Sequence, residues 1–173
     1  MKNARRIFGL ALAIAFVLSA TASCAGGAQS ASGANQAARG GNGVNSLNDV
    51  EGKEWTLSEI RSAGTTVRID RSKLPADGGS GAFTINFQDG MASGMGWPNR
   101  YRGPYTKGSG DALSIGNAAS TMMAAFVELD ELKENEYYGY LSRVTRWAVR
   151  DGRLELYSTN AGGGEAVLVY VLN

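Results

Sequence analysis

The stretch GAFTINFQDGMASG, residues 81–94, decides the fold class because it holds the clearest strand-and-turn pattern in the chain. Phe83, Ile85 and Phe87 alternate with polar residues, which is the period-two pattern of a strand with one buried face. Asp89-Gly90 follows directly, and this dipeptide favours a tight turn between antiparallel strands. The stretch therefore predicts a β-hairpin.

The same strand-and-turn pattern recurs along the chain. In RVTRWAVRDGRLELYS, residues 143–158, apolar residues stand on both sides of a second Asp-Gly turn, Asp151-Gly152. Weaker strands are expected at residues 54–60, 66–70, 103–106, 112–115 and 166–172. We find no internal repeat, so these patterns predict one antiparallel β domain.

One segment departs from this pattern. TMMAAFVELDELKENEYYGYL, residues 121–141, contains good helix formers and no proline, and Ser120 or Thr121 can accept a free backbone N–H at its start. Its apolar residues fall roughly on one helical face, and its methionine pair is expected to fill the core. The sequence thus predicts an α+β fold in which one amphipathic helix packs on a curved antiparallel sheet. The residues of that apolar face are Met122, Met123, Phe126, Leu129, Tyr137 and Leu141.

The N-terminal part of the chain has a different character. Residues 1–23 have a cationic start, an apolar stretch and a small-residue end, as in a secretory signal peptide. The apolar stretch, residues 7–18, is shorter than the roughly 20 residues of a membrane span. Residues 24–46 are rich in Gly, Ala, Ser and Asn and predict a flexible tether. The folded domain is therefore expected at residues 47–173.

The single cysteine of the chain, Cys24, stands where the signal peptide would end. This position predicts cleavage before Cys24 and lipid attachment to it, which would anchor the protein in a bacterial envelope membrane, most simply at the periplasmic face of the outer membrane. Two alternatives remain open: cleavage after Ala22, which gives a soluble periplasmic or secreted protein, and an uncleaved anchor helix. Thr21 departs from the leucine that usually stands three residues before a lipidated cysteine.

Composition excludes several kinds of chemistry. Three of the 17 basic residues, Lys2, Arg5 and Arg6, belong to the predicted signal, so the remaining chain has fewer basic than its 16 acidic residues. This balance argues against a nucleic-acid partner. The chain has no histidine, which excludes a Ser-His-Asp site and the usual zinc ligand sets. We read the carboxylates of residues 128–136 as a solvated acidic face and expect no catalytic residue, no metal and no cofactor.

The stretch GMGWPNRYRGPYTKGSG, residues 94–110, is the candidate binding loop. Its glycines permit backbone conformations that are strained for other residues, and its two prolines argue against a central strand. Trp97, Tyr101 and Tyr105 either pack on the sheet, as large aromatic side chains usually do, or face a ligand. If any surface recognises a partner, we expect it here, because loops on a rigid scaffold carry most recognition.

A set of short motifs in a fixed order resembles the META domain family, which includes HslJ-type bacterial envelope lipoproteins. The resemblance covers residues 52–170 and implies a small antiparallel sheet or cracked β-barrel wrapped around a single α-helix. It also implies a signal-bearing, often lipidated envelope protein with a link to stress response, and it transfers no catalytic residue. The motifs are GKEWTL (52–57), GMGWPNRYRGPY (94–105), LSIGNAASTMMA (113–124), ENEYYGYLSRVTRWAV (134–149) and DGRLELY (151–157).

The chain departs from this family at Pro98 and Ala125, where many relatives have cysteines. The resemblance therefore implies that a bridge between these positions is missing here. Without it, we expect residues 94–103 to loosen and to expose an apolar groove lined by Trp97 and Met123, which would suit an acyl chain or an amphipathic peptide.

Two function classes follow from these observations. The first is a non-enzymatic envelope lipoprotein whose domain has a binding or stress-related role, with an envelope protein or an apolar ligand as partner. The alternative is a carboxylate-dependent envelope hydrolase, which would need convergent ionisable groups with perturbed pKa values. The missing histidine and the scattered acids favour the first class. A purely structural stabiliser of the envelope would have the same sequence features.

Overall fold

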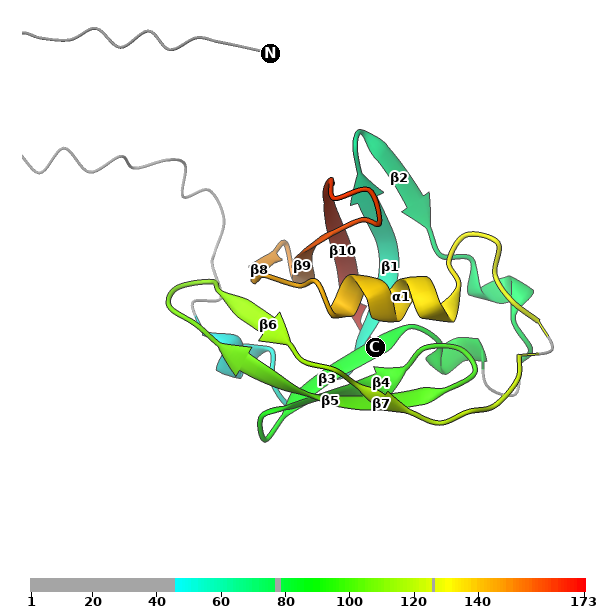
Figure 1. Ribbon diagram of the computed structural model, residues 1–173, viewed down its shortest axis with the longest axis horizontal. Coiled ribbons are helices and arrows are strands. Elements are labelled where there is room, and N and C mark those ends of the chain that lie inside the picture. Colours follow the sequence, from blue (N-terminus) through cyan, green and yellow to red (C-terminus); the bar gives the residue numbers. More distant parts are fainter. Residues whose placement is uncertain (1–45, 77–78, 126) are drawn as a thin grey trace, which may run out of the picture. The chain divides into compact units, whose positions relative to one another are not determined.

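The computed structural model describes residues 46–76, 79–125 and 127–173, and strands dominate this part of the chain (Figure 1). The predicted signal peptide, Cys24 and nearly all of the predicted tether lie outside the described residues. The helical elements are α1 (Glu134–Leu141) and the short 3-10 helices η1 (Leu47–Asp49), η2 (Arg71–Lys73) and η3 (Gly79–Gly81). The strands are β1 (Trp55–Ser62), β2 (Thr65–Arg68), β3 (Thr84–Gln88), β4 (Met91–Met95), β5 (Arg100–Lys107), β6 (Leu113–Ile115), β7 (Ala119–Ser120), β8 (Arg146–Arg150), β9 (Arg153–Thr159) and β10 (Glu165–Leu172).

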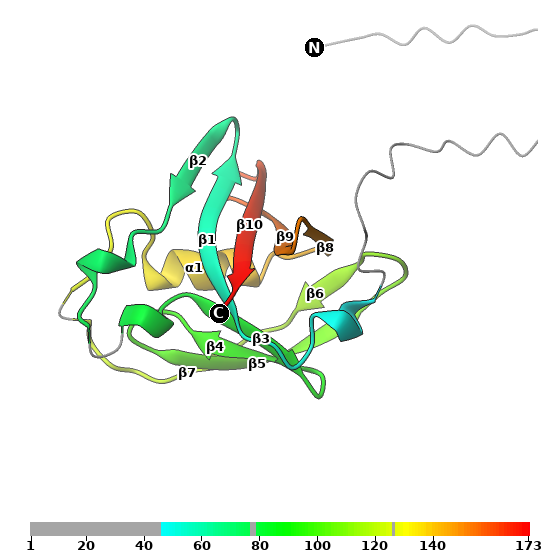
Figure 2. The same ribbon diagram turned by 180° about the vertical axis from the view of Figure 1, so that it is seen from behind.

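The strands form a nearly closed antiparallel barrel. Their order is β6-β5-β4-β3-β1-β10-β9-β8, with β2 paired to β1 and β7 paired to β5. The two end strands meet at a single bridge between Ala112 and Arg146, beside which the Leu113 N–H donates to the Thr145 carbonyl at 3.0 Å. Figures 1 and 2 show the β1–β10–β9–β8 half above the β3–β4–β5 half, with α1 between them.

The two Asp-Gly hairpins predicted from the sequence are confirmed. Asp89 and Gly90 connect β3 to β4, and Asp151 and Gly152 connect β8 to β9. All four residues have positive φ, between 51° and 75°, which is the geometry that a two-residue turn of this kind requires. Each of the five weaker strands that the sequence predicts is also present.

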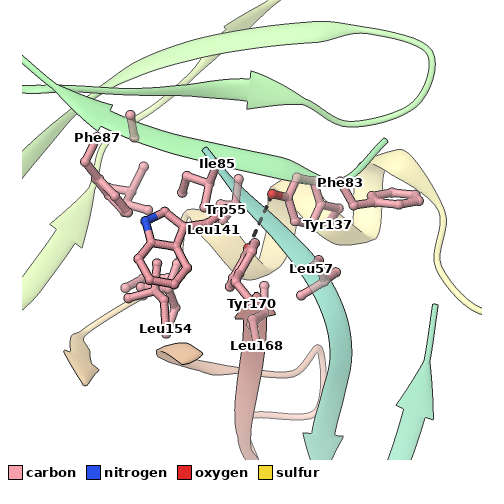
Figure 3. Packing of buried hydrophobic residues seen from close by; sticks show 14 of the residues in the cluster. Trp55, Leu57, Phe83, Ile85, Phe87, Tyr137, Leu141, Leu154, Leu168 and Tyr170 are labelled. Carbon is pink, nitrogen blue, oxygen red and sulfur yellow. Dashed lines mark hydrogen bonds between the residues drawn. The ribbon is translucent and has the colours of Figure 1, made fainter. Parts of the chain in front are cut away.

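The core lies inside the barrel and includes one face of α1 (Figure 3). Tyr137 and Leu141 of the helix are buried, and the Tyr137 ring packs edge-on against Phe83 with 5.3 Å between ring centroids. Edge-to-face packing of this kind adds to the free energy gained from area burial alone. Other core side chains that Figure 3 labels come from four strands: Trp55, Leu57, Ile85, Phe87, Leu154, Leu168 and Tyr170.

The helix predicted for residues 121–141 is wrong over most of its length. Only Glu134–Leu141 is helical, and Lys133, not Ser120 or Thr121, occupies the N-cap position. The Thr121 N–H instead donates to the Arg100 carbonyl at 3.0 Å, so the start of the segment continues the sheet. Pairing with β5 outweighs a helix propensity that amounts to tenths of a kcal/mol per residue.

The prediction that the methionine pair fills the core is also wrong. Met122 is 98% exposed, and Met123 is exposed as well. Both residues precede the helix, so the helical face that would have buried them does not form. Leu129 is buried as expected, although it too precedes α1, and Phe126 lies outside the described residues.

Candidate binding site

The predicted binding loop is mostly β-structure. Residues 94–95 end β4 and Arg100 begins β5, so only residues 96–99 form a hairpin tip. Tyr101 and Tyr105 lie in β5 and are buried, whereas Trp97 lies at the tip and is half-buried. The structure thus places these three side chains in different environments and does not bring them together on one exposed surface.

The glycines of this stretch serve close packing more than unusual backbone angles. Gly110 has a positive φ of 66°, but Gly94, Gly96 and Gly103 do not have positive φ. A Cβ at Gly96 would lie 2.8 Å from both the Glu134 carboxylate and the Tyr138 hydroxyl, closer than real Cβ contacts come. The hairpin tip therefore packs directly on α1 at Glu134 and Tyr138.

Asn99 and Glu134 connect this tip to the helix. Glu134 Oε1 accepts hydrogen bonds from the backbone N–H groups of Trp97 and Asn99, at 3.1 and 2.8 Å. Glu134 Oε2 accepts one from Asn99 Nδ2 at 2.8 Å. The Asn99 side chain, in a residue only 5% exposed, also accepts from Thr121 Oγ1 at 2.9 Å and from the Met123 N–H at 2.6 Å. One asparagine thus joins the hairpin, the helix and the segment that precedes it.

A further hydrogen bond closes the same region. Trp97 Nε1 donates to the Val127 carbonyl at 2.8 Å, while Asn99 Nδ2 donates to the Met123 carbonyl at 3.0 Å. These bonds flank Pro98 on one segment and Ala125 on the other, so the two segments lie side by side. Hydrogen bonds therefore join the places where the family resemblance implies a missing bridge, and they close the loop that we expected to open.

Three tyrosine hydroxyl groups lie beneath this network. Those of Tyr101 and Tyr137 both donate to the Thr84 carbonyl, at 2.8 and 3.0 Å, and that of Tyr170 donates to the Tyr137 hydroxyl at 3.3 Å (Figure 3). Burial raises the pKa of Tyr137 to about 12 and raises the pKa values of Tyr101 and Tyr170 well above their usual range. These phenols are therefore neutral hydrogen-bond donors at pH 7 and position α1 on the sheet.

A groove of about 340 Å³ lies between the chain that follows β6 and the second half of α1. None of its lining residues is charged, and two of them, Ile115 and Leu141, are buried. Its volume is at the lower end of the 300–1,000 Å³ typical of small-molecule sites. The lining residues are Ile115, Gly116, Asn117, Ala118, Tyr138, Gly139, Leu141 and Ser142.

Acidic residues give no comparable site. Within residues 46–76, 79–125 and 127–173, no group of three His, Cys, Asp or Glu residues could hold a metal ion. Glu59 and Glu155, which are 9% and 7% exposed, lie on the sheet face opposite the core. Arg61 Nε donates to Glu59 at 2.7 Å, Arg61 Nη1 lies 3.2 Å from Glu155, and the Tyr157 hydroxyl donates to Glu155 at 2.7 Å. Their partners show that these buried carboxylates balance arginine charge.

Sequence reasoning missed both Asn99 and the groove. The groove joins residues 115–118 to residues 138–142, which are far apart in the chain, and no motif spans that distance. One signal was present, because residues 114–125 contain no charged side chain, as SIGNAASTMMAA shows. In the described part of the chain, no helix is both long and apolar enough to cross a membrane.

Comparison with known proteins gives a family match and two similar solved structures. Residues 48–170 match the family model of the META domain. The NMR structure of a protein from Burkholderia xenovorans is similar to this chain, with 25% sequence identity and a TM-score of 0.53 over 73% of this chain and 86% of that one. The crystal structure of a DUF4847 family protein from Bacteroides vulgatus ATCC 8482 has 14% identity and a TM-score of 0.49 over 73% and 96% of the two chains. No curated protein matches the chain.

Proposed function

Because this chain belongs to the META domain family, we propose that it is a non-enzymatic protein of the bacterial cell envelope that binds an apolar group in the groove between β6 and α1. The partner is an envelope protein or a lipid that presents a short apolar segment. Lipid attachment at Cys24 would hold the domain at the membrane, where it would meet such a partner. This part of the proposal rests on the N-terminal sequence.

The groove is the observation that supports binding. One wall is the end of β6 with the three residues that follow it, and the other is α1 with Ser142, so the groove is largely preformed, as small-ligand sites usually are. Ile115, Leu141 and the Tyr138 ring give it an apolar surface, while Asn117 and Ser142 add neutral polar groups at its rim. A volume of about 340 Å³ suits one large side chain or the end of an acyl chain better than a whole lipid.

The hydrolase alternative has no such support. The residues that line the groove include no Asp and no Glu. Glu59 and Glu155 are engaged with arginines on a different face of the domain, and burial keeps the core tyrosines protonated. A hydrolase would instead need acids with perturbed pKa values that converge on a pocket.

A titration tests the proposal. The mature chain with Cys24→Ser is titrated with a lysolipid and with a fatty acid, while backbone NMR shifts and tryptophan fluorescence are followed. We expect saturable shifts centred on residues 115–118 and 138–142. Shifts that do not saturate, or turnover of an ester or glycan substrate, would contradict it.

Two variants sharpen this test. Ala118→Trp should fill the groove and abolish the shifts, because Ala118 lines it. Ala119→Trp is the matched control, because Ala119 pairs with exposed Arg102 on the outer face of the sheet and is not a lining residue. Equal loss of binding in both variants would place the ligand elsewhere.

A further inference from the structure

A second hollow lies on the outer face of strands β3, β4 and β5, the face turned away from α1. Its volume is about 320 Å³. Phe87, Ala92 and Tyr101 of the same strands point into the core, so alternation along each strand turns their neighbours outward. We call this feature the polar hollow, and its lining residues are Asn86, Gln88, Asp89, Met91, Ser93 and Arg102.

The register of the three strands explains why the surface is hollowed here. Ser93 of β4 pairs with Asn86 of β3 on one side and with Arg102 of β5 on the other. Side chains that are directly opposite lie about 5 Å apart, so these three form one row across the sheet. Serine is short and its two neighbours are longer, which lowers the centre of the row. The polar hollow is therefore a consequence of strand pairing.

The lining side chains supply both donors and acceptors of hydrogen bonds. A guanidinium group only donates and a carboxylate only accepts, whereas an amide and a hydroxyl group do both. Within residues 46–76, 79–125 and 127–173, the one hydrogen bond made by a lining side chain runs from Asn86 Nδ2 to the Lys53 carbonyl, at 2.9 Å. The other polar groups of the hollow are therefore available to a ligand.

The charges of the polar hollow argue against an ionic ligand. Arg102 and Asp89 have opposite signs, and the other lining residues are neutral, so the lining has no net charge. An anion that approached Arg102 would also meet the carboxylate of Asp89, and a cation would meet the reverse arrangement. The lining is equally unsuited to an acyl chain, because Met91 is its one apolar side chain and such sites are mostly apolar.

We propose that the polar hollow binds a saccharide unit of a glycan. Each sugar hydroxyl group both donates and accepts, which matches the mixture of groups in the lining. Asp89 and the amide oxygens can accept from hydroxyl groups, while Arg102 and the amide N–H groups can donate to them. Half-buried Met91 offers an apolar contact to the C–H groups of a sugar ring.

The exposure of the polar hollow sets the expected strength of binding. Gln88, Asp89 and Arg102 are exposed, so water competes for each hydrogen bond, and the net gain per bond is about 0.5–1.5 kcal/mol. Binding should therefore be weak, with a Kd of roughly 1 mM. The polar hollow and the groove share no lining residue, so this proposal does not depend on the proposed function.

An NMR titration tests the proposal. The mature chain with Cys24→Ser is titrated with tri-N-acetylchitotriose and with maltotriose, which distinguish a site for acetamido sugars from one for sugars with hydroxyl groups alone. We expect saturable backbone shifts centred on residues 86–93 and 102 with at least one trisaccharide. Sodium phosphate is the control for an anion site and should cause no saturable shift there.

Two pairs of variants locate the site. Ser93→Phe should fill the polar hollow and abolish binding, whereas Met95→Phe changes a residue on the same face of β4 that does not line it. Arg102→Ala should weaken binding about tenfold, through loss of a charged donor. Its control is Arg100→Ala, because Arg100 is exposed on the same face of β5 but lies outside the lining.

Thermal unfolding confirms that each variant is folded before its binding is compared. Three results would overturn the proposal: no saturable shift with either trisaccharide, equal loss of binding in a variant and its control, or phosphate shifts as large as those caused by sugar. Sugar shifts centred on residues 115–118 and 138–142 would place the saccharide in the groove and would also overturn it.

Discussion

At the scale of single residues, the buried amide of Asn99 has every hydrogen-bonding position filled. Its two N–H groups donate to Glu134 and to the Met123 carbonyl, and its oxygen accepts from Thr121 and from the Met123 N–H. An amide can make four such bonds, so no other side chain replaces it without loss. This residue, more than the aromatic residues around it, determines how the hairpin tip meets α1.

Replacement of Asn99 should therefore be costly. We expect Asn99→Ala to lower the free energy of unfolding by about 1–3 kcal/mol, because it removes hydrogen bonds to the half-buried Glu134 carboxylate and to the backbone of Met123. Asn99→Asp should also destabilise, since it places a second carboxylate against Glu134. Denaturant unfolding measures both, with the exposed Asn135→Ala as control. A loss in Asn99→Ala no larger than in the control would contradict this role.

The buried tyrosines predict a loss of stability at high pH. The pKa of Tyr137 is about 12 in the folded protein and about 10 when unfolded, so the folded state binds the phenol proton more tightly. This contribution is fully present below pH 10 and is lost as the pH rises through about 12. The free energy of unfolding should therefore fall over that interval, and less steeply in Tyr137→Phe. Half-exposed Tyr140→Phe is the control, and identical pH profiles for the two variants would count against the mechanism.

At the scale of elements, local patterns predicted strands well and the helix poorly. Alternation around Ile85 and the Asp89-Gly90 turn act within a few residues, so their result can be read from the sequence. Residues 121–123 instead hydrogen-bond to Arg100 and Asn99, which are about twenty residues away. No local pattern reports such partners, so the helix propensity of this segment gave the wrong structure.

The close approach of two backbone segments also cannot be predicted from the sequence. Gly94 is an example. A Cβ there would overlap with the Thr84 carbonyl group on the neighbouring strand β3, where the backbone cannot easily move. We expect Gly94→Ala to destabilise the domain by about 1–3 kcal/mol, the usual cost of overpacking. In the control Gly81→Ala, the new Cβ would approach only Met95 Sδ at 4.0 Å. Thermal unfolding compares the two, and similar melting temperatures would show that the strands can move apart.

At the scale of the whole molecule, barrel closure creates the candidate site. Strands β6 and β8 meet at one bridge, and beyond it α1 lies beside the open edge, which leaves the groove between them. The family resemblance gave the architecture, including the cracked barrel and its one described helix. The resemblance did not predict the groove. The position of the groove depends on where pairing between the two end strands stops, which is just after the bridge between Ala112 and Arg146.

Membrane attachment, which the N-terminal sequence predicts, also belongs to this scale, since it would determine where the domain works. If Cys24 is lipidated, the mature protein should fractionate with membranes, and its intact mass should include fatty acid. Cys24→Ala should release the protein or leave its signal peptide uncleaved, because no acceptor thiol remains in the chain. Thr21→Leu is the matched variant: it supplies the leucine usual at that position and should keep the protein in the membrane fraction. An unmodified soluble chain that begins at Ser23 would show that cleavage follows Ala22, and the anchor would then have to be abandoned.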